Sequence, residues 1–468
     1  MKEVKTYNPL VIIGEESILN YNVHQYIVNE NLKDIKKDYG VFFTPEWVID
    51  FMVDLIKVEK YIDNNDILIL EPACGLAQFL SGIKRKKPAL FNKANLFGVE
   101  INQDIINYLN NTCKTDNIKL YNNDYLLWNP KSSFDLIMGN PPYGIPSNSD
   151  HYTIKISPKT KKQYKALFET WYGKYNVYGA FIEKSVKLLK NEGQLIFIVP
   201  ATFMILDEFK KLREHLSRNG KTSIIYLGPD VFKPEAYVSS VVLNFIKSDK
   251  SNSTLELFEY TNKKIKTIKT NSNWKGETVK FETNYSTTLE SICPYRLGDI
   301  YQIRISPRTP EIKNNPFIMK NNNLDKNIYL PILNGKNLKL NKIIYENLSG
   351  YWINKQNVSR FRGYFGNPHI VVGLGFREND KIAAALDAKC YPWMGDIYHL
   401  LRDNNLFNIN FDLGEEEVIN FLISDYIQKY IKDVYREITY HLSITQLANL
   451  PLPDKTAWAA LKKETFYE

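Results

Sequence analysis

Residues 134–143 read Phe134-Asp135-Leu136-Ile137-Met138-Gly139-Asn140-Pro141-Pro142-Tyr143, an apolar run that ends in a polar and aromatic turn. Short apolar runs bounded by turn residues are typical of strands buried in a parallel sheet. Two adjacent prolines fix two φ angles, so the carbonyl of Pro141 has a defined direction. The segment therefore predicts a buried strand that delivers an amide side chain, a fixed carbonyl and an aromatic ring to one place.

This turn suits the binding of an exocyclic amine. The amino nitrogen of an adenine ring is a poor nucleophile because its lone pair is delocalised into the ring. The side-chain oxygen of Asn140 and the carbonyl of Pro141 could accept its two hydrogens, and acceptors that are fixed in advance need no reorganisation during reaction. Tyr143 would offer a flat face to the base. The same four residues also occur as an ordinary loop, so the segments upstream must decide.

Two upstream runs favour a nucleoside site. Residues 67–75 form an apolar run that ends in a tight turn of small residues, as expected where a strand leads the chain beneath a nucleoside cofactor. With Gly75 as its one glycine, this turn does not match the dinucleotide fingerprint. The next run ends in Glu100, which could accept both ribose hydroxyls, and Asp124 follows it. Each acid alone is typical of a solvated surface, but their order after successive strands favours a binding role.

These segments resemble the gamma-class adenine-N6 DNA methyltransferases, and most of all the TaqI type. The matching segments are residues 40–52, 70–74, 98–100, 139–144, 173–181, 199–202, 332–338, 391–393 and 435–437. The resemblance implies an α/β fold: a Rossmann-like methyltransferase domain with a mainly parallel seven-stranded sheet, and a mixed α/β C-terminal domain that recognises the DNA sequence. It implies S-adenosyl-L-methionine as the methyl donor. TaqI-type enzymes modify the adenine of TCGA, so the same or an overlapping palindrome is expected here.

The resemblance also assigns roles to individual residues. Thr44 and the turn after residue 70 would hold the methionine end of the cofactor, Glu100 its ribose, and Asp124 the amino group of its adenine. The full expected cofactor-binding set is Thr44, Glu71, Pro72, Ala73, Cys74, Gly75, Glu100, Ile101, Asp124, Tyr125, Asn140, Pro142 and Phe181. The expected catalytic set is Asn140, Pro141, Pro142, Tyr143 and Phe245.

Two aromatic residues in these sets have an alternative interpretation. Phe181 would pack on the base of the cofactor, and Phe245 would stack on the flipped target base opposite Tyr143. From pattern alone, Phe181 is an ordinary core residue of a helix and Phe245 an ordinary core residue of a strand. Methyl transfer by this route needs neither a metal nor a covalent enzyme intermediate. A paired adenine must first be swung out of the duplex.

The charge distribution is compatible with a nucleic-acid partner. The chain of 468 residues has a net charge of +8, and residues 1–150 sum to −4, whereas residues 151–190 and 251–345 each sum to +7. Basic stretches would neutralise phosphates, although a solvated lysine-rich face is the alternative for each stretch. The expected partner is double-stranded DNA, bound by a monomer.

Composition and length limit the expected metal sites, disulfides, membrane spans and domain organisation. Four scattered cysteines without paired spacing indicate neither a zinc site nor a disulfide framework, and a reducing cytoplasm is the simplest location. No apolar run is long enough to span a membrane. The expected organisation is an N-terminal cap (1–38), the catalytic domain (39–247), a crossing segment (248–275) and the recognition domain (276–468).

The sequence therefore predicts a site-specific DNA adenine-N6 methyltransferase of a bacterial restriction–modification system, with a separate cognate endonuclease acting on the same site. Asn-Pro-Pro-Tyr also occurs in methyltransferases that act on release-factor glutamine or on RNA, which is one alternative. A second alternative is a DNA specificity module that binds but no longer methylates. Asp230 and Glu235 are the nearest approach to a nuclease acid pair, but no Glu-x-Lys follows them, so a fused nuclease is not expected.

Overall fold

The structure is a computed structural model that describes residues 44–61, 66–112, 115–147, 154–234, 236–249, 253–321, 324–376, 381–402, 411–439 and 441–463. The chain divides into two compact units, Met1–Lys280 and Phe281–Glu468. This division lies close to residue 276, where we expect the recognition domain to begin. The expected N-terminal cap, residues 1–38, lies outside the described residues.

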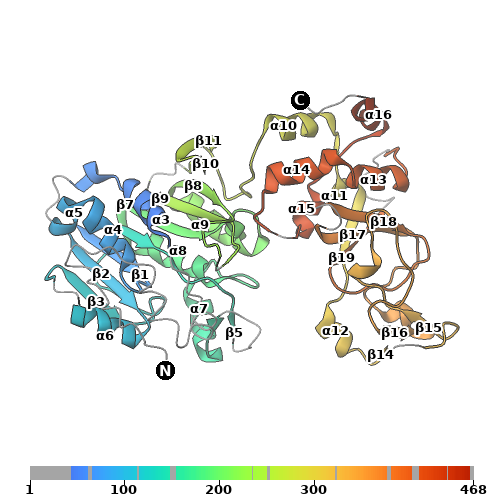
Figure 1. The fold of residues 1–468 in the computed structure, drawn as a ribbon, viewed down its shortest axis with the longest axis horizontal. Helices are drawn as coiled ribbons and strands as arrows, with labels where there is room; N and C mark the ends of the chain where they lie inside the picture. The colour runs from blue at the N-terminus through green and yellow to red at the C-terminus, as the bar shows by residue number, and fades with distance from the viewer. Residues whose placement is uncertain are drawn as a thin grey trace, which may run out of the picture. The chain divides into compact units, whose positions relative to one another are not determined.

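Unit 1 is built on one nine-stranded sheet with the strand order β11-β10-β8-β9-β7-β4-β1-β2-β3 (Figure 1). The strands are β1 (Leu68–Pro72), β2 (Asn95–Glu100), β3 (Ile118–Asn122), β4 (Phe134–Gly139), β7 (Leu189–Pro200), β8 (Gly220–Gly228), β9 (Ser240–Lys247), β10 (Leu255–Thr261) and β11 (Lys264–Asn271). Strands β3, β2, β1, β4 and β7 are parallel, and β9 is antiparallel to both of its neighbours. The expected α/β fold with a mainly parallel sheet is confirmed.

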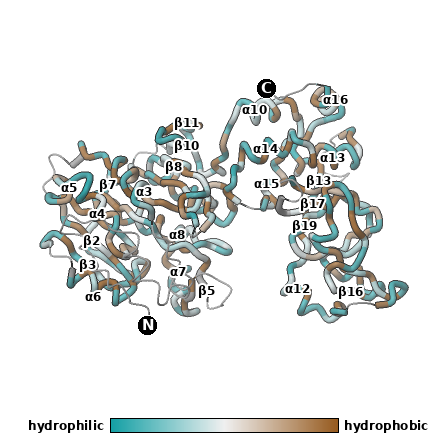
Figure 2. Tube along the Cα trace, viewed as in Figure 1, coloured by the Kyte–Doolittle hydropathy of each residue, from teal (hydrophilic) through white to brown (hydrophobic). Residues whose placement is uncertain are grey.

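Helices flank this sheet and bury their apolar faces. The helices and short elements of unit 1 are α3 (Glu46–Asp54), η1 (Val58–Tyr61), α4 (Gln78–Lys86), α5 (Pro88–Lys93), α6 (Gln103–Thr112), β5 (Pro146–Ser147), β6 (Ile154–Lys155), α7 (Pro158–Leu167), α8 (Val177–Leu188), η2 (Ala201–Met204), η3 (Asp207–Phe209) and α9 (Lys210–Asn219). Helices α3, α4 and α5 pack together, and α8 packs against α9 (Figure 1). The C-terminal half of β7 is buried and hydrophobic (Figure 2). None of the helices in the described ranges combines the length and apolar character that a membrane span requires.

The sheet has two strands more than the seven that we expected. Strands β10 and β11 lie within residues 248–275, where we expected a crossing between domains. They form a hairpin whose turn residues Asn262 and Lys263 have φ values of 52° and 60°, as the favoured tight hairpin turns require. The lysine-rich β11 lies at the sheet edge, so it needs little apolar surface, and the sequence signal for a strand is therefore weak.

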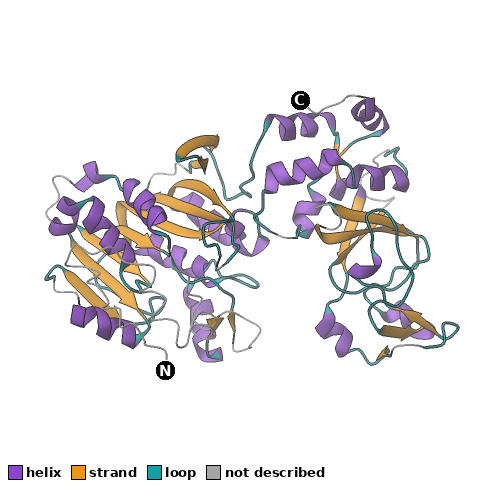
Figure 3. Ribbon diagram, viewed as in Figure 1, coloured by secondary structure: helices purple, strands orange, loops and turns teal. Residues whose placement is uncertain are grey.

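The described residues of unit 2 form three small antiparallel sheets with helices and long loops (Figure 3). The sheets have the orders β13-β19-β17-β18, β14-β16-β15 and β12-β20. Their strands are β12 (Tyr295–Arg296), β13 (Tyr301–Ile305), β14 (Ile318–Lys320), β15 (Tyr329–Pro331), β16 (Tyr351–Asn354), β17 (His369–Phe376), β18 (Ile382–Asp387), β19 (Ile397–Arg402) and β20 (Pro451–Leu452). The helices are α10 (Asn284–Ile292), α11 (Leu297–Ile300), α12 (Thr309–Lys313), η4 (Gly335–Asn337), η5 (Lys355–Arg360), α13 (Glu415–Leu422), α14 (Asp425–Tyr435), α15 (Ile444–Ala448) and α16 (Lys455–Lys463).

The segments of unit 2 that carry the family resemblance form its scaffold. Asn337 is wholly buried, and its amide nitrogen donates to the carbonyls of Ile344 and Glu346 at 2.6 and 2.8 Å. The indole of Trp393, also wholly buried, donates to Asp387 at 2.8 Å. These side chains hold loops to the core, so their presence predicts the fold of unit 2 and not its base contacts.

Candidate active site

Most of the expected site residues, but not Phe245, lie at the carboxyl edge of the central strands. β1 lies between β4 and β2, with Ile69 opposite Leu136 and Pro72 opposite Val99. Because parallel strands end at the same edge, the turn after β1, Glu100 at the end of β2 and Asn140 after β4 lie together there. This is the switch point of the strand order, where open α/β sheets bind ligands.

Glu71 is a buried acid that supports the start of α4. Its carboxyl group accepts hydrogen bonds from the backbone amides of Phe79 and Leu80 at 3.2 and 3.0 Å. Burial is the main cause that raises the pKa of Glu71 to about 8, so burial favours the protonated carboxyl group when no ligand is bound. A cation beside it would favour the ionised form.

The turn after Glu71 consists of small residues, so its backbone, and no long side chain, faces the carboxyl edge. Ala73 and Gly75 both have positive φ, 52° and 49°. A Cβ on Gly75 would meet nothing within 4 Å, so the left-handed backbone and not a lack of space explains this glycine. Cys74 is buried, and its sulfur faces Gly98 of β2. The Cys74 side chain therefore belongs to the packing between β1 and β2.

Glu100 ties the ends of β1 and β2 together. One carboxylate oxygen accepts from the amide of Gly75 at 3.0 Å and the other from the amide of Asn102 at 2.9 Å. Burial raises the pKa of Glu100 above its ordinary value. The next residue, Ile101, has a side chain that is 52% exposed, so this edge offers an apolar surface beside a carboxyl group.

Asp124 follows β3 and is held by two donors. Its Oδ1 accepts from the amide of Leu126 at 2.9 Å, and its Oδ2 accepts from the hydroxyl of Tyr164 at 2.6 Å. Tyr125 and Phe181 are both buried, with ring centroids 4.9 Å apart. These two rings contact each other beside Asp124, the arrangement that ordinary core packing also gives.

Asn140 is oriented by Thr44, the residue that precedes α3 by two positions. The amide nitrogen of Asn140 donates to Oγ1 of buried Thr44 at 3.0 Å. Pro141 is buried and Pro142 is half-buried. This contact connects two segments that lie 96 residues apart in sequence and holds the amide of Asn140 in place.

Tyr143 is anchored by its hydroxyl and by two rings. The hydroxyl donates to the carbonyl of Ile198 in β7 at 2.9 Å. Tyr178 and Phe232 both meet the Tyr143 ring edge-on, with centroids 6.1 Å away in each case. Burial raises the pKa of Tyr143 well above its ordinary value, so the phenol stays a donor. The ring is thus fixed in direction next to Asn140.

The structure corrects the expectation for Phe245. Phe245 is wholly buried in β9, opposite Leu195 of β7 and Thr222 of β8. The end of β9 that lies at the catalytic edge is Ser240, opposite Pro200. Five residues of extended chain span roughly 17 Å, so Phe245 lies deep in the sheet and is a core residue.

Phe232, which the sequence pattern does not single out, lies beside Tyr143 and meets its ring edge-on. It belongs to the connection between β8 and β9, which leaves and re-enters the sheet at the catalytic edge, and it contacts Tyr143. The strand order identifies Phe232 as a candidate, because binding sites of open α/β sheets are formed by loops at the carboxyl edge. The sequence pattern had drawn attention only to the acids on either side of it.

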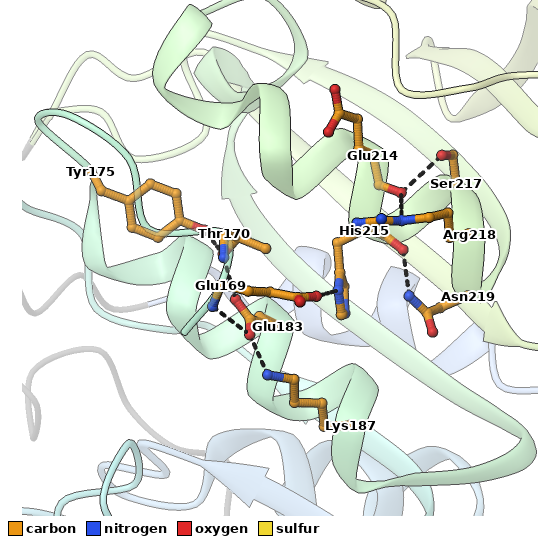
Figure 4. A network of polar contacts seen from close by, with 10 residues as sticks. All are labelled: Glu169, Thr170, Tyr175, Glu183, Lys187, Glu214, His215, Ser217, Arg218 and Asn219. Atoms are coloured by element: carbon orange, nitrogen blue, oxygen red, sulfur yellow. Dashed lines mark hydrogen bonds and ion pairs between the residues drawn. The ribbon is translucent and has the colours of Figure 1, made fainter. Parts of the chain in front are cut away.

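A partly buried polar network supports the loop before α8 (Figure 4). Glu183 of α8 is wholly buried and accepts from the backbone amides of Glu169 and Thr170 at 3.1 and 2.9 Å, while the carboxylate of Glu169 meets Nδ1 of His215 in α9 at 2.8 Å. The loop ends at Asn176, whose side-chain oxygen accepts from the amide of Gly144 at 2.8 Å. The network therefore supports the turn that carries Asn140 and Tyr143.

Comparisons with known proteins agree with this geometry. The Eco57I restriction-modification methylase family matches residues 50–232, and the TaqI-like C-terminal specificity domain matches residues 330–452. The type II methyltransferase M.TthHB8I of Thermus thermophilus is 37% identical over 427 residues, which cover 90% of this chain and 92% of that protein. The modification methylase CviBIII of Paramecium bursaria Chlorella virus NC1A is 30% identical over 36% of this chain and 40% of its own.

Solved structures show the same fold at low identity. The DrdV–DNA complex has a TM-score of 0.55 and 13% identity, with 96% of this chain and 60% of that chain covered. A nuclease-deletion mutant of the type ISP enzyme LlaGI has a TM-score of 0.54 and 13% identity, covering 96% and 56%. The 37% identity to a type II methyltransferase over 90% of the chain agrees with the fold and with the geometry of the sheet edge. The chain belongs to the type II methyltransferases of restriction–modification systems, whose methyl donor is S-adenosyl-L-methionine.

Proposed function

We propose that the protein is a site-specific DNA adenine-N6 methyltransferase that modifies an adenine flipped out of duplex DNA. The observation that carries this proposal is the end of β4. There Asn140 is oriented by Thr44, and the neighbouring Tyr143 ring is fixed by Tyr178 and Phe232. An amide acceptor beside an anchored aromatic face suits an aromatic base that carries an exocyclic amine.

The acids at the edge fit the cofactor. S-adenosyl-L-methionine supplies an electrophilic methyl group on a sulfonium, and it presents an ammonium group, two ribose hydroxyls and an adenine amino group, all of which are donors. Glu71, Glu100 and Asp124 offer three carboxyl groups as acceptors in matching order along the edge. We propose that the ammonium group binds near Glu71, the ribose at Glu100, and the adenine beside Asp124 against the apolar surface of Ile101.

Asn140 and Pro141 would act on the target amine. Since the amide nitrogen of Asn140 donates to Thr44, its carbonyl oxygen is the atom that can accept an amine hydrogen. The carbonyl of Pro141 is the second acceptor. Together they would draw the amine toward tetrahedral geometry, and this stabilisation grows as charge develops. No strong base is required, because the methylated amine loses its proton readily once it is cationic.

Base flipping is expected to be visible directly. Because the target amine is paired inside the duplex, the adenine must leave the stack to reach Asn140. A fluorescent adenine analogue at the target position should brighten when the protein binds, while the same analogue two base pairs away should not. Active protein that leaves both fluorescence signals unchanged would contradict this part of the proposal.

The expected recognition site is TCGA or an overlapping palindrome. This rests on the resemblance to TaqI-type enzymes and on the match of residues 330–452 to a TaqI-like specificity domain. Each wrong base pair should cost about 1–3 kcal/mol, so methylation should fall steeply at altered sites. Sequencing of DNA methylated by the purified protein should report N6-methyladenine in that motif. A different motif would remove the specificity assignment, and a different methylated base would remove the adenine assignment.

Two other functions are less well supported. A methyltransferase that acts on release-factor glutamine or RNA would not need a second unit that matches a DNA specificity domain. A module that binds DNA but no longer methylates would not need the acids at the sheet edge, and cofactor binding measured by calorimetry separates it from an enzyme. We propose further that the protein works as a monomer in the cytoplasm, and that a separate endonuclease cleaves the same site.

A further inference from the structure

Helix α7 lies between the segment that follows the catalytic turn and Asp124 at the cofactor end of the candidate site. It follows the turn of Tyr143 through β5 and β6, and it packs against β5 (Figure 1). On its other side, Tyr164 of α7 donates its hydroxyl to Oδ2 of Asp124 at 2.6 Å. One helix therefore contacts the segment beyond the catalytic turn and also the acid that we assign to the cofactor's adenine.

Tyr164 contributes to the attachment of α7 to the rest of unit 1. Within α7, all of whose residues are described, Tyr164 is the one buried side chain. Its ring also lies 6.1 Å from the ring of Trp171, in the loop that leads to α8. Burial and the neighbouring carboxylate of Asp124 both raise the pKa of Tyr164, so the hydroxyl stays protonated and donates to Asp124 at all working pH values.

The outer face of α7 is strongly basic. The helix contains four lysines and no acid, and Lys159, Lys162 and Lys165 are exposed. Lysine ammonium groups on one helix are suited to neutralising neighbouring phosphates of a nucleic-acid backbone. The same ten-residue helix thus has a basic outer face and an inward hydrogen bond from Tyr164 to Asp124.

We propose that Tyr164 couples DNA binding to cofactor binding. This inference rests on the proposed function. The lysine face of α7 contacts the phosphate backbone beside the flipped base. This contact keeps α7 in the position in which Tyr164 reaches Asp124. Tyr164 is then a positioning residue: its hydrogen bond fixes the carboxylate of Asp124, which retains lone pairs for the amino group of the cofactor's adenine. Each ligand therefore raises the affinity of the other.

The coupling can be measured by calorimetry with S-adenosylhomocysteine, which cannot turn over, and a duplex that contains the methylated site. Reciprocity requires the cofactor product and the DNA to raise each other's affinity by the same factor, which we expect to be roughly fivefold to tenfold. Tyr164→Phe removes the hydroxyl and keeps the ring, so the factor should fall to within about twofold of one. A merely structural role would lower the melting temperature without removing the coupling selectively.

A second pair of variants tests the outer face. Lys162→Gln with Lys165→Gln should weaken DNA binding and reduce the slope of log affinity against log salt by about two, one for each phosphate contact. Binding of S-adenosylhomocysteine without DNA should not change. Lys221→Gln is the matched control, since Lys221 is exposed at the start of β8, at the opposite edge of the sheet.

Three results would overturn the coupling: equal factors for the wild type and Tyr164→Phe, a wild-type factor of one, or an unchanged salt slope in the double lysine variant. In each case sequencing of the methylated DNA still reports on the proposed function by itself. Absence of N6-methyladenine would instead refute the proposed function, so the two failures are distinguishable.

Discussion

Asn140→Ala is expected to lower the rate of methylation on the order of a hundredfold to a thousandfold, the loss typical of removing one preorganised group that stabilises developing charge. The side chain is held by Thr44 at 3.0 Å before substrate arrives, so no reorganisation accompanies the reaction. Because the acceptor acts mainly in the transition state, affinity for the cofactor should stay within several-fold of the wild type. Single-turnover methylation and cofactor calorimetry measure the two effects separately.

Two further variants sharpen this experiment. Asn140→Asp keeps an acceptor oxygen but loses the donor to Thr44, so it should recover part of the rate. Asn191→Ala is the control, because Asn191 is exposed near the start of β7, at the opposite edge of the sheet. If Asn140→Ala retains more than about a tenth of the normal rate, Asn140 is not part of the mechanism.

The central strands and their polar ends could be predicted from the sequence because one local rule governs both. Buried parallel strands require continuous apolar runs, and residues that follow such strands meet at one edge. Glu100 and Asn140 lie where this rule places them. The rule does not say what each side chain contacts. Glu71 accepts a hydrogen bond from the start of α4, and Asp124 accepts one from Tyr164. No sequence pattern that joins Glu71 to α4 or Asp124 to Tyr164 can be recognised in advance.

The sequence was least informative where tertiary contacts decide. Phe232 and Phe245 both lie near hydrophobic residues in the sequence. Because β9 runs antiparallel to β7, Phe232, which precedes β9, lies at the catalytic edge, and Phe245 lies in the core. In unit 2, the buried side chains of Asn337 and Trp393 hold loops to the scaffold. Similarity at buried positions reports a shared fold, whereas specificity depends on exposed side chains that can differ freely.

Removing both aromatic residues at the target site should have the second largest effect. Stacking on a flipped base is worth roughly 1–3 kcal/mol for each base by alanine substitution. Tyr143→Ala should therefore slow methylation by roughly tenfold to a hundredfold, and Tyr143→Ala combined with Phe232→Ala by more, because Phe232 contacts Tyr143 and shares the aromatic wall. The fluorescent adenine analogue should brighten less in each single variant and least in the double variant.

Phe245→Ala tests whether Phe232 or Phe245 stacks on the flipped base. Phe245 is wholly buried between β7 and β8, so its truncation should lower the free energy of unfolding by about 3–5 kcal/mol. Protein that remains folded should still show the full increase in analogue fluorescence, because Phe245 lies away from the flipped base. Denaturant unfolding and fluorescence on the same samples separate stability from stacking. If Phe245→Ala abolishes the fluorescence change in folded protein and Phe232→Ala leaves it intact, Phe245 is the stacking residue and the position of Phe232 beside Tyr143 is incidental.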